Sequence, residues 1–211
     1  MRLMTGVYRP TSGTIYIEDI PVFDNPLAKE KIVFVPDDLY FLTGTSLNRM
    51  AKMYEALYPR FDTSRFNELV RMFKLNPKVS LTKYSKGMKR QAAIVLALST
   101  RSDYLFFDET FDGLDPEKRN LVRNLIAQDN VDFQTTVVLT SHSLRELEDT
   151  CDQLALLHDG KLVVSSDVHH LKTSFFKIQI ALKEAFDITT FKEFNVLNCC
   201  SPLSSRYRRQ H

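Results

Sequence analysis

Four consecutive large apolar residues, Tyr104 to Phe107, constrain the fold of this chain more than any other feature. A run without polar alternation is typical of a short strand covered on both faces, as in a parallel sheet flanked by helices. Two carboxylates, Asp108 and Glu109, follow where this strand is expected to end. Ligands of open α/β sheets bind outside the carboxyl ends of the strands, so the pair predicts a site at that edge.

The two acids also predict the chemistry of that site. Adjacent carboxylates at the mouth of a buried strand repel each other and lose hydration, so a cation or a ligand proton is expected nearby. We expect Asp108 to hold a metal ion directly or through water and Glu109 to polarise an attacking water. The alternative for this segment alone is a buried strand followed by a helix with Asp115 as its N-cap and Pro116 as its first residue.

A second segment, Ser85 to Met88, precedes an apolar helical pattern that runs through Ala92 and Leu96. Ser85 suits an N-cap, and the free amides of a helix N-terminus attract anions. Gly87 would let a phosphate approach closely, and Lys86 adds positive charge. Without its neighbours, Ser-x-Gly before an amphipathic helix would indicate only a helix cap.

A third segment, Ser141-His142-Ser143, follows the β-branched run from Thr135 to Thr140, which predicts another buried strand. At the end of a strand that neighbours the first, the His142 imidazole could donate to a phosphate and couple to Glu109. A lone histidine would more often be structural. Ser143 and Glu146 have the spacing of a capping box that opens the next helix.

The three segments resemble motifs of the ATP-binding cassette (ABC) ATPases in the order in which they occur along the chain. Ser85–Met88 resembles the signature, the segment from Tyr104 to Pro116 resembles the Walker B and D-loop, and His142 resembles the switch histidine. The resemblance covers roughly Arg2 to Lys172. Tyr84, Lys86 and Met88 replace the Leu, first Gly and Gln of the family signature. The resemblance implies a P-loop NTPase-type α/β fold, with a parallel-sheet core and an inserted helical subdomain.

The resemblance also implies a function: hydrolysis of ATP with Mg²⁺ by a homodimer or heterodimer of ATPase subunits joined head to tail. Glu109 and His142 would be catalytic, Asp108 would hold the metal, and Asp115 of the D-loop would help to fix the dimer interface. The residues that would bind nucleotide held by the second copy are Ser85, Lys86, Gly87 and Met88. Such a subunit is cytoplasmic, peripheral on the inner face of the cell membrane, and drives transport through a separate transmembrane permease.

Asp37 occupies the place of the family's Q-loop glutamine, directly after the apolar run from Ile32 to Pro36. In the family, this glutamine approaches the metal and the attacking water and links the two lobes. An aspartate can orient a water but is shorter and charged. An Asp-Asp turn after the proline is an equally good interpretation of the same residues.

The chain has six glycines, and none of them forms the phosphate cradle G-x-x-x-x-G-K-[ST]. Gly160-Lys161 follows Asp159 between two apolar runs, so we interpret it as a hairpin turn. The residues from Met1 to Gly13 resemble the family's segment just after the cradle, where a helix ends at Gly6. We therefore expect an N-terminally truncated sequence that lacks the first strand and the phosphate loop, binds ATP poorly and turns it over negligibly. The alternative is a complete protein with a divergent start.

The pattern of apolar and polar residues changes along the chain, and these changes predict the domain organisation. We expect a partial RecA-like core over 1–38, a helical subdomain with the signature over 39–100, and the rest of the core over 101–172. Residues 173–211 would form a C-terminal extension that begins with a strand over 175–181. Its last residues have no amphipathic period and are expected to be disordered.

Composition excludes several other classes of protein. With 28 Lys and Arg against 26 Asp and Glu, no broad nucleic-acid-binding face is expected. Three cysteines, Cys151, Cys199 and Cys200, give neither a disulfide framework nor zinc spacing. No apolar run reaches membrane-spanning length. Two rival functions remain, a non-transport ABC protein and a non-hydrolysing regulatory cassette that keeps the fold only for dimerisation.

Overall fold

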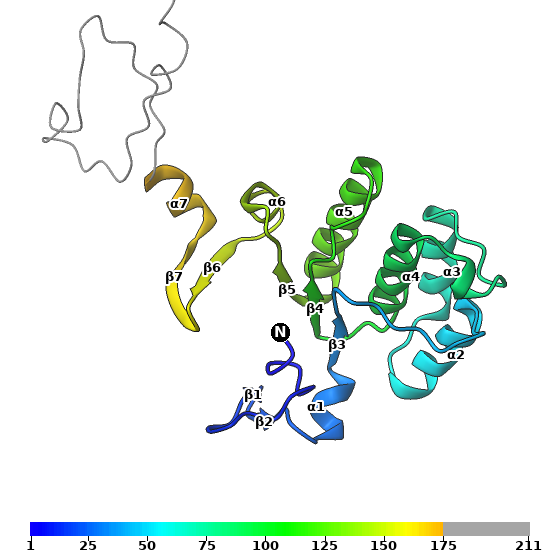
Figure 1. Cartoon of the computed structure of the whole chain (residues 1–211), viewed down its shortest axis with the longest axis horizontal. Helices are drawn as coiled ribbons and strands as arrows, with labels where there is room; N and C mark the ends of the chain where they lie inside the picture. The colour runs from blue at the N-terminus through cyan, green and yellow to red at the C-terminus, as the bar shows by residue number, and fades with distance from the viewer. Residues whose placement is uncertain (175–211) are drawn as a thin grey trace, which may run out of the picture. The chain divides into compact units, whose positions relative to one another are not determined.

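A three-stranded parallel sheet in the order β3–β4–β5 forms the centre of the fold (Figure 1). The computed structural model describes residues 1–174, and Met1–His169 form one compact unit. In the register of the sheet, Val35 lies opposite Phe107 and Asp108 opposite Thr140. The predicted parallel α/β sheet is confirmed. Its strands are β3 (Ile32–Val35), β4 (Tyr104–Asp108) and β5 (Thr136–Thr140).

Strand β4 is covered on both faces, as its unbroken apolar run predicts. Leu105 and Phe107 are buried in the main core, whereas Phe106 points the other way and packs with Val22 and Ile32. The side chains alternate because successive residues of a strand face opposite sides of the sheet. The strand is therefore fixed from both sides, and so is the position of the two acids that follow it.

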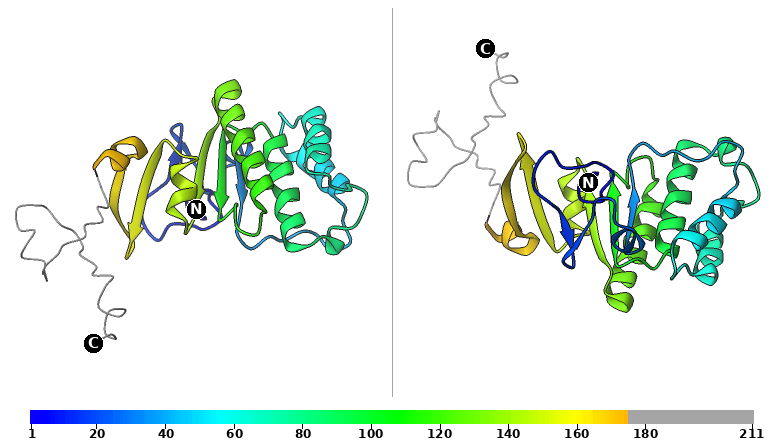
Figure 2. Two further views of the ribbon diagram at one scale, coloured as in Figure 1. Left: turned by 90° about the horizontal axis from the view of Figure 1, so that it is seen from above. Right: turned by 90° about the horizontal axis from the view of Figure 1, so that it is seen from below.

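Three helices pack together beyond β3, as both views in Figure 2 show. Among them, α4 is buried around nearly all of its circumference from Ala92 to Ser99, because it lies between the sheet and the other two helices. Phe66, Leu69, Val70 and Phe73 form an apolar stripe at helical spacing, and all four are buried. The helices are α2 (Leu47–Leu57), α3 (Thr63–Met72) and α4 (Lys86–Ser99), with the 3₁₀ turn η1 (Leu81–Lys83) before α4.

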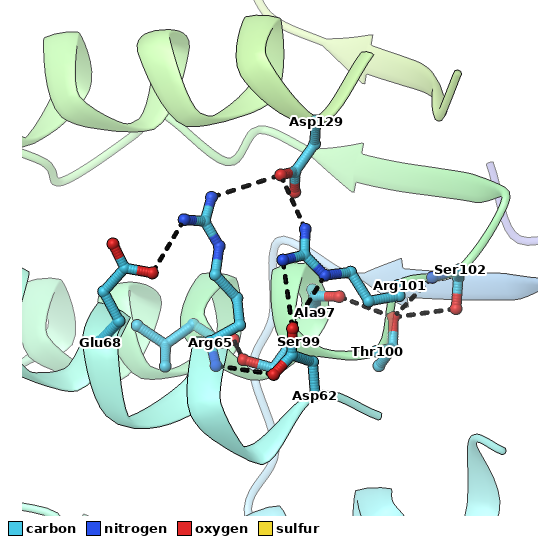
Figure 3. A network of polar contacts seen from close by, with 10 residues as sticks. Asp62, Arg65, Glu68, Ala97, Ser99, Thr100, Arg101, Ser102 and Asp129 are labelled. Carbon is cyan, nitrogen blue, oxygen red and sulfur yellow. Dashed lines mark hydrogen bonds and ion pairs between the residues drawn. The ribbon is translucent and has the colours of Figure 1, made fainter. Parts of the chain in front are cut away.

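A network of ion pairs ties α3 to α5 (Pro116–Phe133) (Figure 3). The buried Asp129 carboxylate of α5 accepts from Arg65 of α3 at 3.3 Å and from Arg101 at 3.1 Å. Arg101 also donates to Asp62, the N-cap of α3, at 3.2 Å. Two arginines and two aspartates thus neutralise one another, which limits the cost of burying charge between the elements.

The first residues form a single helical turn, whereas the sequence predicted the end of a longer helix. The Val7 amide donates to the Arg2 carbonyl and the Gly6 amide to the Leu3 carbonyl, which is the pattern of a glycine-terminated helix end. Gly6 has a φ of +62°, and a Cβ there would lie 2.7 Å from the Val22 carbonyl oxygen. The predicted helix stop at Gly6 is therefore confirmed. The elements that follow are β1 (Tyr16–Ile17), β2 (Ile20–Pro21) and α1 (Pro26–Glu30).

The described part of the chain ends in a hairpin and a short helix. Asp159 and Gly160 have φ of +48° and +70°, so the Asp-Gly-Lys sequence forms the predicted tight turn. Asp167 accepts from the His169 amide at 2.7 Å and caps the short helix that follows the hairpin. The elements are α6 (Leu144–Glu148), β6 (Gln153–His158), β7 (Lys161–Asp167) and α7 (Val168–Ser174). The strand predicted over 175–181 lies outside the described residues.

Candidate active site

Asp108 and Thr140 are joined side by side at the carboxyl edge of the sheet. The Thr140 hydroxyl donates to Asp108 Oδ1 at 2.6 Å and accepts from the Glu109 amide at 3.1 Å. The parallel register makes this contact, because it aligns the last residues of β4 and β5. Thr140 was not predicted as a site residue. Its position at the end of the predicted strand, directly before Ser141-His142, could have identified Thr140 as a site residue.

Glu109 and His142 meet across the same edge. The His142 amide donates to Glu109 Oε2 at 3.3 Å, and His142 Nε2 lies 3.5 Å from Oε1. Glu109 has a left-handed φ of +49°, which costs roughly 1 kcal/mol for a residue with a Cβ. The imidazole is 96% exposed, so it is free to meet a ligand above the edge. The sequence placed these residues on neighbouring strands, and the structure brings them together.

The predicted capping box between Ser143 and Glu146 is wrong. Ser143 makes no side-chain cap hydrogen bond, and its amide donates to Ser141 Oγ at 3.0 Å. This leaves both carboxylate oxygens of Glu146 for other donors, Arg119 at 2.8 Å and the Ser141 hydroxyl at 2.8 Å. The serine two residues earlier satisfies the amide locally, so the carboxylate is available to α5.

The segment Ser85–Met88, called the signature segment below, opens α4 as predicted. Ser85 is the N-cap, and its hydroxyl accepts from the Met88 amide at 3.2 Å. A Cβ at Gly87 would lie 2.9 Å from the carbonyl oxygen of Gly113, so this glycine permits close contact with the loop 109–115. Asp115 caps α5 by accepting from the Lys118 amide at 2.9 Å, which confirms its capping role. Ser85, Lys86, Gly113 and Asp115 are all exposed.

Asp37 is held by a buried arginine of α4. Arg90, 1% exposed, donates to the Asp37 carboxylate at 2.7 Å and to the carbonyls of Pro36 and Asp37 at 2.8 and 2.9 Å. The Q-loop position is therefore joined to the same helix that carries the signature segment. Arg90 was not predicted as a site residue. It lies near the start of a helix that is rich in lysine and arginine, and nothing in that pattern indicates that one of these side chains is buried.

The donor set fits Mg²⁺ but not a complete nucleotide site. Asp108 keeps Oδ2 without a hydrogen-bond partner in the described residues, and Mg²⁺ beside phosphates uses one or two carboxylates with waters. Among residues 1–174, no group of three or more His, Cys, Asp or Glu could hold a metal unaided. The sequence contains no glycine-rich loop with a lysine to cradle a triphosphate.

Comparisons with known proteins agree with this geometry. The ABC transporter family profile matches residues 1–112. The ABC transporter ATP-binding protein YtrB of Bacillus subtilis is 28% identical over 181 residues, which cover 86% of this chain and 62% of YtrB. The human ATP-binding cassette sub-family A member 2 is 30% identical over 185 residues, 82% of this chain and 7% of that protein. The chain thus spans less than two thirds of the length of these relatives.

Solved structures share the fold. The ATP-binding subunit of an ABC transporter matches with a TM-score of 0.74 at 20% identity, over 82% of this chain and 74% of that one. The ATP-binding cassette MJ0796, described as a dimer in a post-hydrolysis state with ADP and Pi, matches with a TM-score of 0.70 at 19% identity. That match covers 79% of this chain and 78% of MJ0796.

Proposed function

The chain belongs to the ABC transporter family of ATP-binding cassette ATPases, and from this premise we propose that it energises a transporter through a separate membrane subunit. The contact between Glu109 and His142, 3.5 Å from carboxylate to imidazole, carries the proposal. A water polarised by Glu109 would be the nucleophile, and His142 would donate to the phosphate that is attacked.

Each residue of the edge has a separate task in this proposal. Asp108 would hold Mg²⁺, directly or through water, with Oδ2, while the Thr140 hydroxyl fixes Oδ1. Bound Mg²⁺ would supply charge neutralisation for the phosphate oxygens. Glu109 is oriented by the His142 amide, so its carboxylate is aligned before a substrate binds. Asp37 would act through its bond to Arg90 and not at the metal.

The signature segment, in which Ser85 and Lys86 are exposed, supports a site shared between two copies. Ser85, Lys86, Gly87 and Met88 would bind the nucleotide held by a second ATPase subunit, identical or related, and Asp115 would help to fix that interface. A dimer is described for MJ0796. We propose that 1–38 and 101–172 form the RecA-like core, that 39–100 form the helical subdomain and that 173–211 form an extension. None of the helices in 1–174 is long and apolar enough to cross a bilayer. From its family we propose that the chain is a peripheral subunit on the inner face of the cell membrane.

The test distinguishes a defect in nucleotide binding from a defect in the catalytic step. We expect the 211-residue chain to bind MgATP weakly and to hydrolyse it negligibly, because the amides and lysine of a phosphate loop supply most of the cradle. A strand and loop of the pattern G-x-x-x-x-G-K-[ST], added before Met1, should restore hydrolysis, measured as phosphate release. Glu109→Gln in that protein should then lower the rate by about 10²-fold or more.

Glu117→Gln is the matched control, since Glu117 is an exposed carboxylate on the first turn of α5, and it should leave the rate unchanged. A folded, loop-restored protein without hydrolysis would contradict the catalytic assignment and favour a regulatory cassette. Rapid hydrolysis by the 211-residue chain itself, abolished by Glu109→Gln, would contradict the expected impairment.

A further inference from the structure

A continuous chain of hydrogen bonds joins the loop 109–115 to the switch loop, residues 141–143. Arg119 Nε donates to the Leu114 carbonyl at 3.0 Å, and its guanidinium also donates to Glu146 Oε1 at 2.8 Å. Glu146 Oε2 accepts from the Ser141 hydroxyl at 2.8 Å, which in turn accepts from the Ser143 amide at 3.0 Å. Every donor in the series faces an acceptor, so one arrangement of protons satisfies all four bonds.

These bonds are stronger than ordinary surface contacts. The Glu146 side chain is 15% exposed and both of its oxygens are used, while Arg119 presents two nitrogens to two different segments. Bonds between charged groups that are partly withdrawn from water exceed neutral or fully exposed ones in strength. Arg119 and Glu146 belong to different helices, α5 and α6, so the link does not follow from either element alone.

The link through Arg119 and Glu146 attaches the second end of the loop 109–115 to the switch loop. At its first residue, this loop is already bound to the switch loop's strand and backbone through Thr140 and His142. Arg119 binds the other end at the Leu114 carbonyl, next to Asp115, and Glu146 binds Arg119. With both ends attached, a displacement of Asp115 is transmitted to the residues that flank His142.

We propose that Arg119 and Glu146 are positioning residues that make the loop 109–115 and the switch loop move as one unit. Under the proposed function, on which this role rests, contact of Asp115 with a second copy would thereby align His142 over the phosphate. Neither residue touches the reacting atoms, and each acts through the loop it binds.

Amide hydrogen exchange of the ¹⁵N-labelled 211-residue chain, followed by NMR without nucleotide, tests the link. The Leu114 amide, bonded to the Phe111 carbonyl at 3.2 Å, reports on one loop, and the Ser143 amide reports on the other. We expect Arg119→Met to accelerate exchange at Ser143, and Glu146→Gln to accelerate exchange at Leu114, each roughly tenfold. The double variant should exceed neither single variant by more than about twofold at either amide, because one link is lost in all three.

Asp149→Asn is the matched control. It also replaces a carboxylate at the α6 end by an amide, and it weakens the 3.8 Å pair of Arg123 with Asp149 between the same two helices. It should leave both reporter amides unchanged. Arg119→Lys retains a charge for Glu146 but cannot also replace the bond of Nε, so it should restore protection at Ser143 and not at Leu114. This variant carries the test if Arg119→Met does not fold.

Acceleration confined to the mutated residue's own segment, or additive effects in the double variant, would overturn the proposal. Because no nucleotide is present, this result is independent of the hydrolysis assay. A failure of the link therefore leaves the catalytic assignment intact, and a failure of hydrolysis leaves the link intact.

Discussion

Arg90 is the most deeply buried charged side chain of the described region. Its contribution to stability depends on which groups neutralise its charge. Its guanidinium binds two main-chain carbonyls and one carboxylate of the segment after β3, while Nε has no partner. The partners differ in environment, because the Asp37 side chain is 54% exposed. The arginine therefore depends on this segment more than the aspartate depends on the arginine.

This asymmetry gives a prediction at the residue scale. Arg90→Met should lower the free energy of unfolding by about 2–3 kcal/mol, because charge-assisted bonds to the carbonyls of Pro36 and Asp37 are lost. Asp37→Asn should cost less than about 1 kcal/mol, since the Asp37 side chain is largely exposed and the Arg90 guanidinium keeps both carbonyl partners. Urea unfolding followed by circular dichroism measures both. Equal losses in the two variants would show that the carboxylate, not the carbonyls, holds the arginine.

At the scale of elements, α3 is held at its first turn by a charge. Asp62 Oδ1 accepts from the Arg65 amide at 2.8 Å, and this bond, with the Arg101 guanidinium, keeps the pKa of Asp62 below its ordinary value. Burial has the opposite effect on Asp129, whose pKa is raised although Arg65 and Arg101 lie beside it. The two aspartates of the network in Figure 3 therefore have opposite effects on stability as the pH falls.

The direction in which Asp62 changes the free energy of unfolding with pH follows from the linkage between protonation and folding. A carboxyl whose folded pKa is depressed adds stability above its unfolded pKa, near 3.9, and loses it as pH falls through the folded pKa. Asp62→Asn keeps a capping oxygen but removes the charge, so it should cost roughly 0.5–1 kcal/mol at pH 7 and almost nothing near pH 2. Urea unfolding of both proteins across this range gives the difference. A constant difference would show that the charge of Asp62 is irrelevant to α3.

The raised pKa of Asp129 affects the stability of the same network with the opposite sign. Its ionised form is the disfavoured one in the folded protein, so its contribution increases the free energy of unfolding as pH falls through the folded pKa. Arg101 binds both carboxylates, so this contribution is coupled to that of Asp62 and the measured difference belongs to the pair.

At the scale of the whole molecule, the sheets of the described region have open edges, including those at β5 and at the β6–β7 hairpin. Among residues 1–174, β5 is paired only with β4, and β6 and β7 pair only with each other. The hairpin also exposes four apolar side chains, at 50 to 73% of their surface, which is unusual for contiguous residues. They are Leu156, Leu157, Leu162 and Val163. Unpaired edges and apolar patches both favour association between chains.

We therefore expect the 211-residue chain to associate with increasing concentration. Leu157→Glu should shift sedimentation equilibrium toward the monomer, because it places a charge in the exposed hairpin. Leu27→Glu on α1 is the control, since Leu27 is similarly exposed, at 65% against 73%, but lies on another element. Equal shifts in the two variants would show that the hairpin has no special part in association.

Much of the candidate site at the edge of the sheet was predictable because its signals are local. The apolar run of β4, the acids that end it, and the caps at Ser85 and Asp115 depend on neighbours within a few residues, and the structure confirms each of them. The pairing of Glu109 with His142 was also predictable, because parallel strands present their carboxyl ends at one edge. The capping box failed because a bond from the Ser143 amide to Ser141, two residues away, replaced the expected bond to Glu146, three residues away.

The sequence by itself thus determined the strands, the caps and the residues at the edge of the sheet, since these follow from periodicity and short-range hydrogen bonding. Only the tertiary structure decided the partners of the long polar side chains: Arg90 with Asp37, Arg119 with Glu146, and Arg65 and Arg101 with Asp129. An arginine reaches across elements that are far apart in the chain, and several carboxylates are chemically equivalent partners for it. The choice among them is made by the packing that brings one carboxylate within hydrogen-bond distance and removes both groups from water.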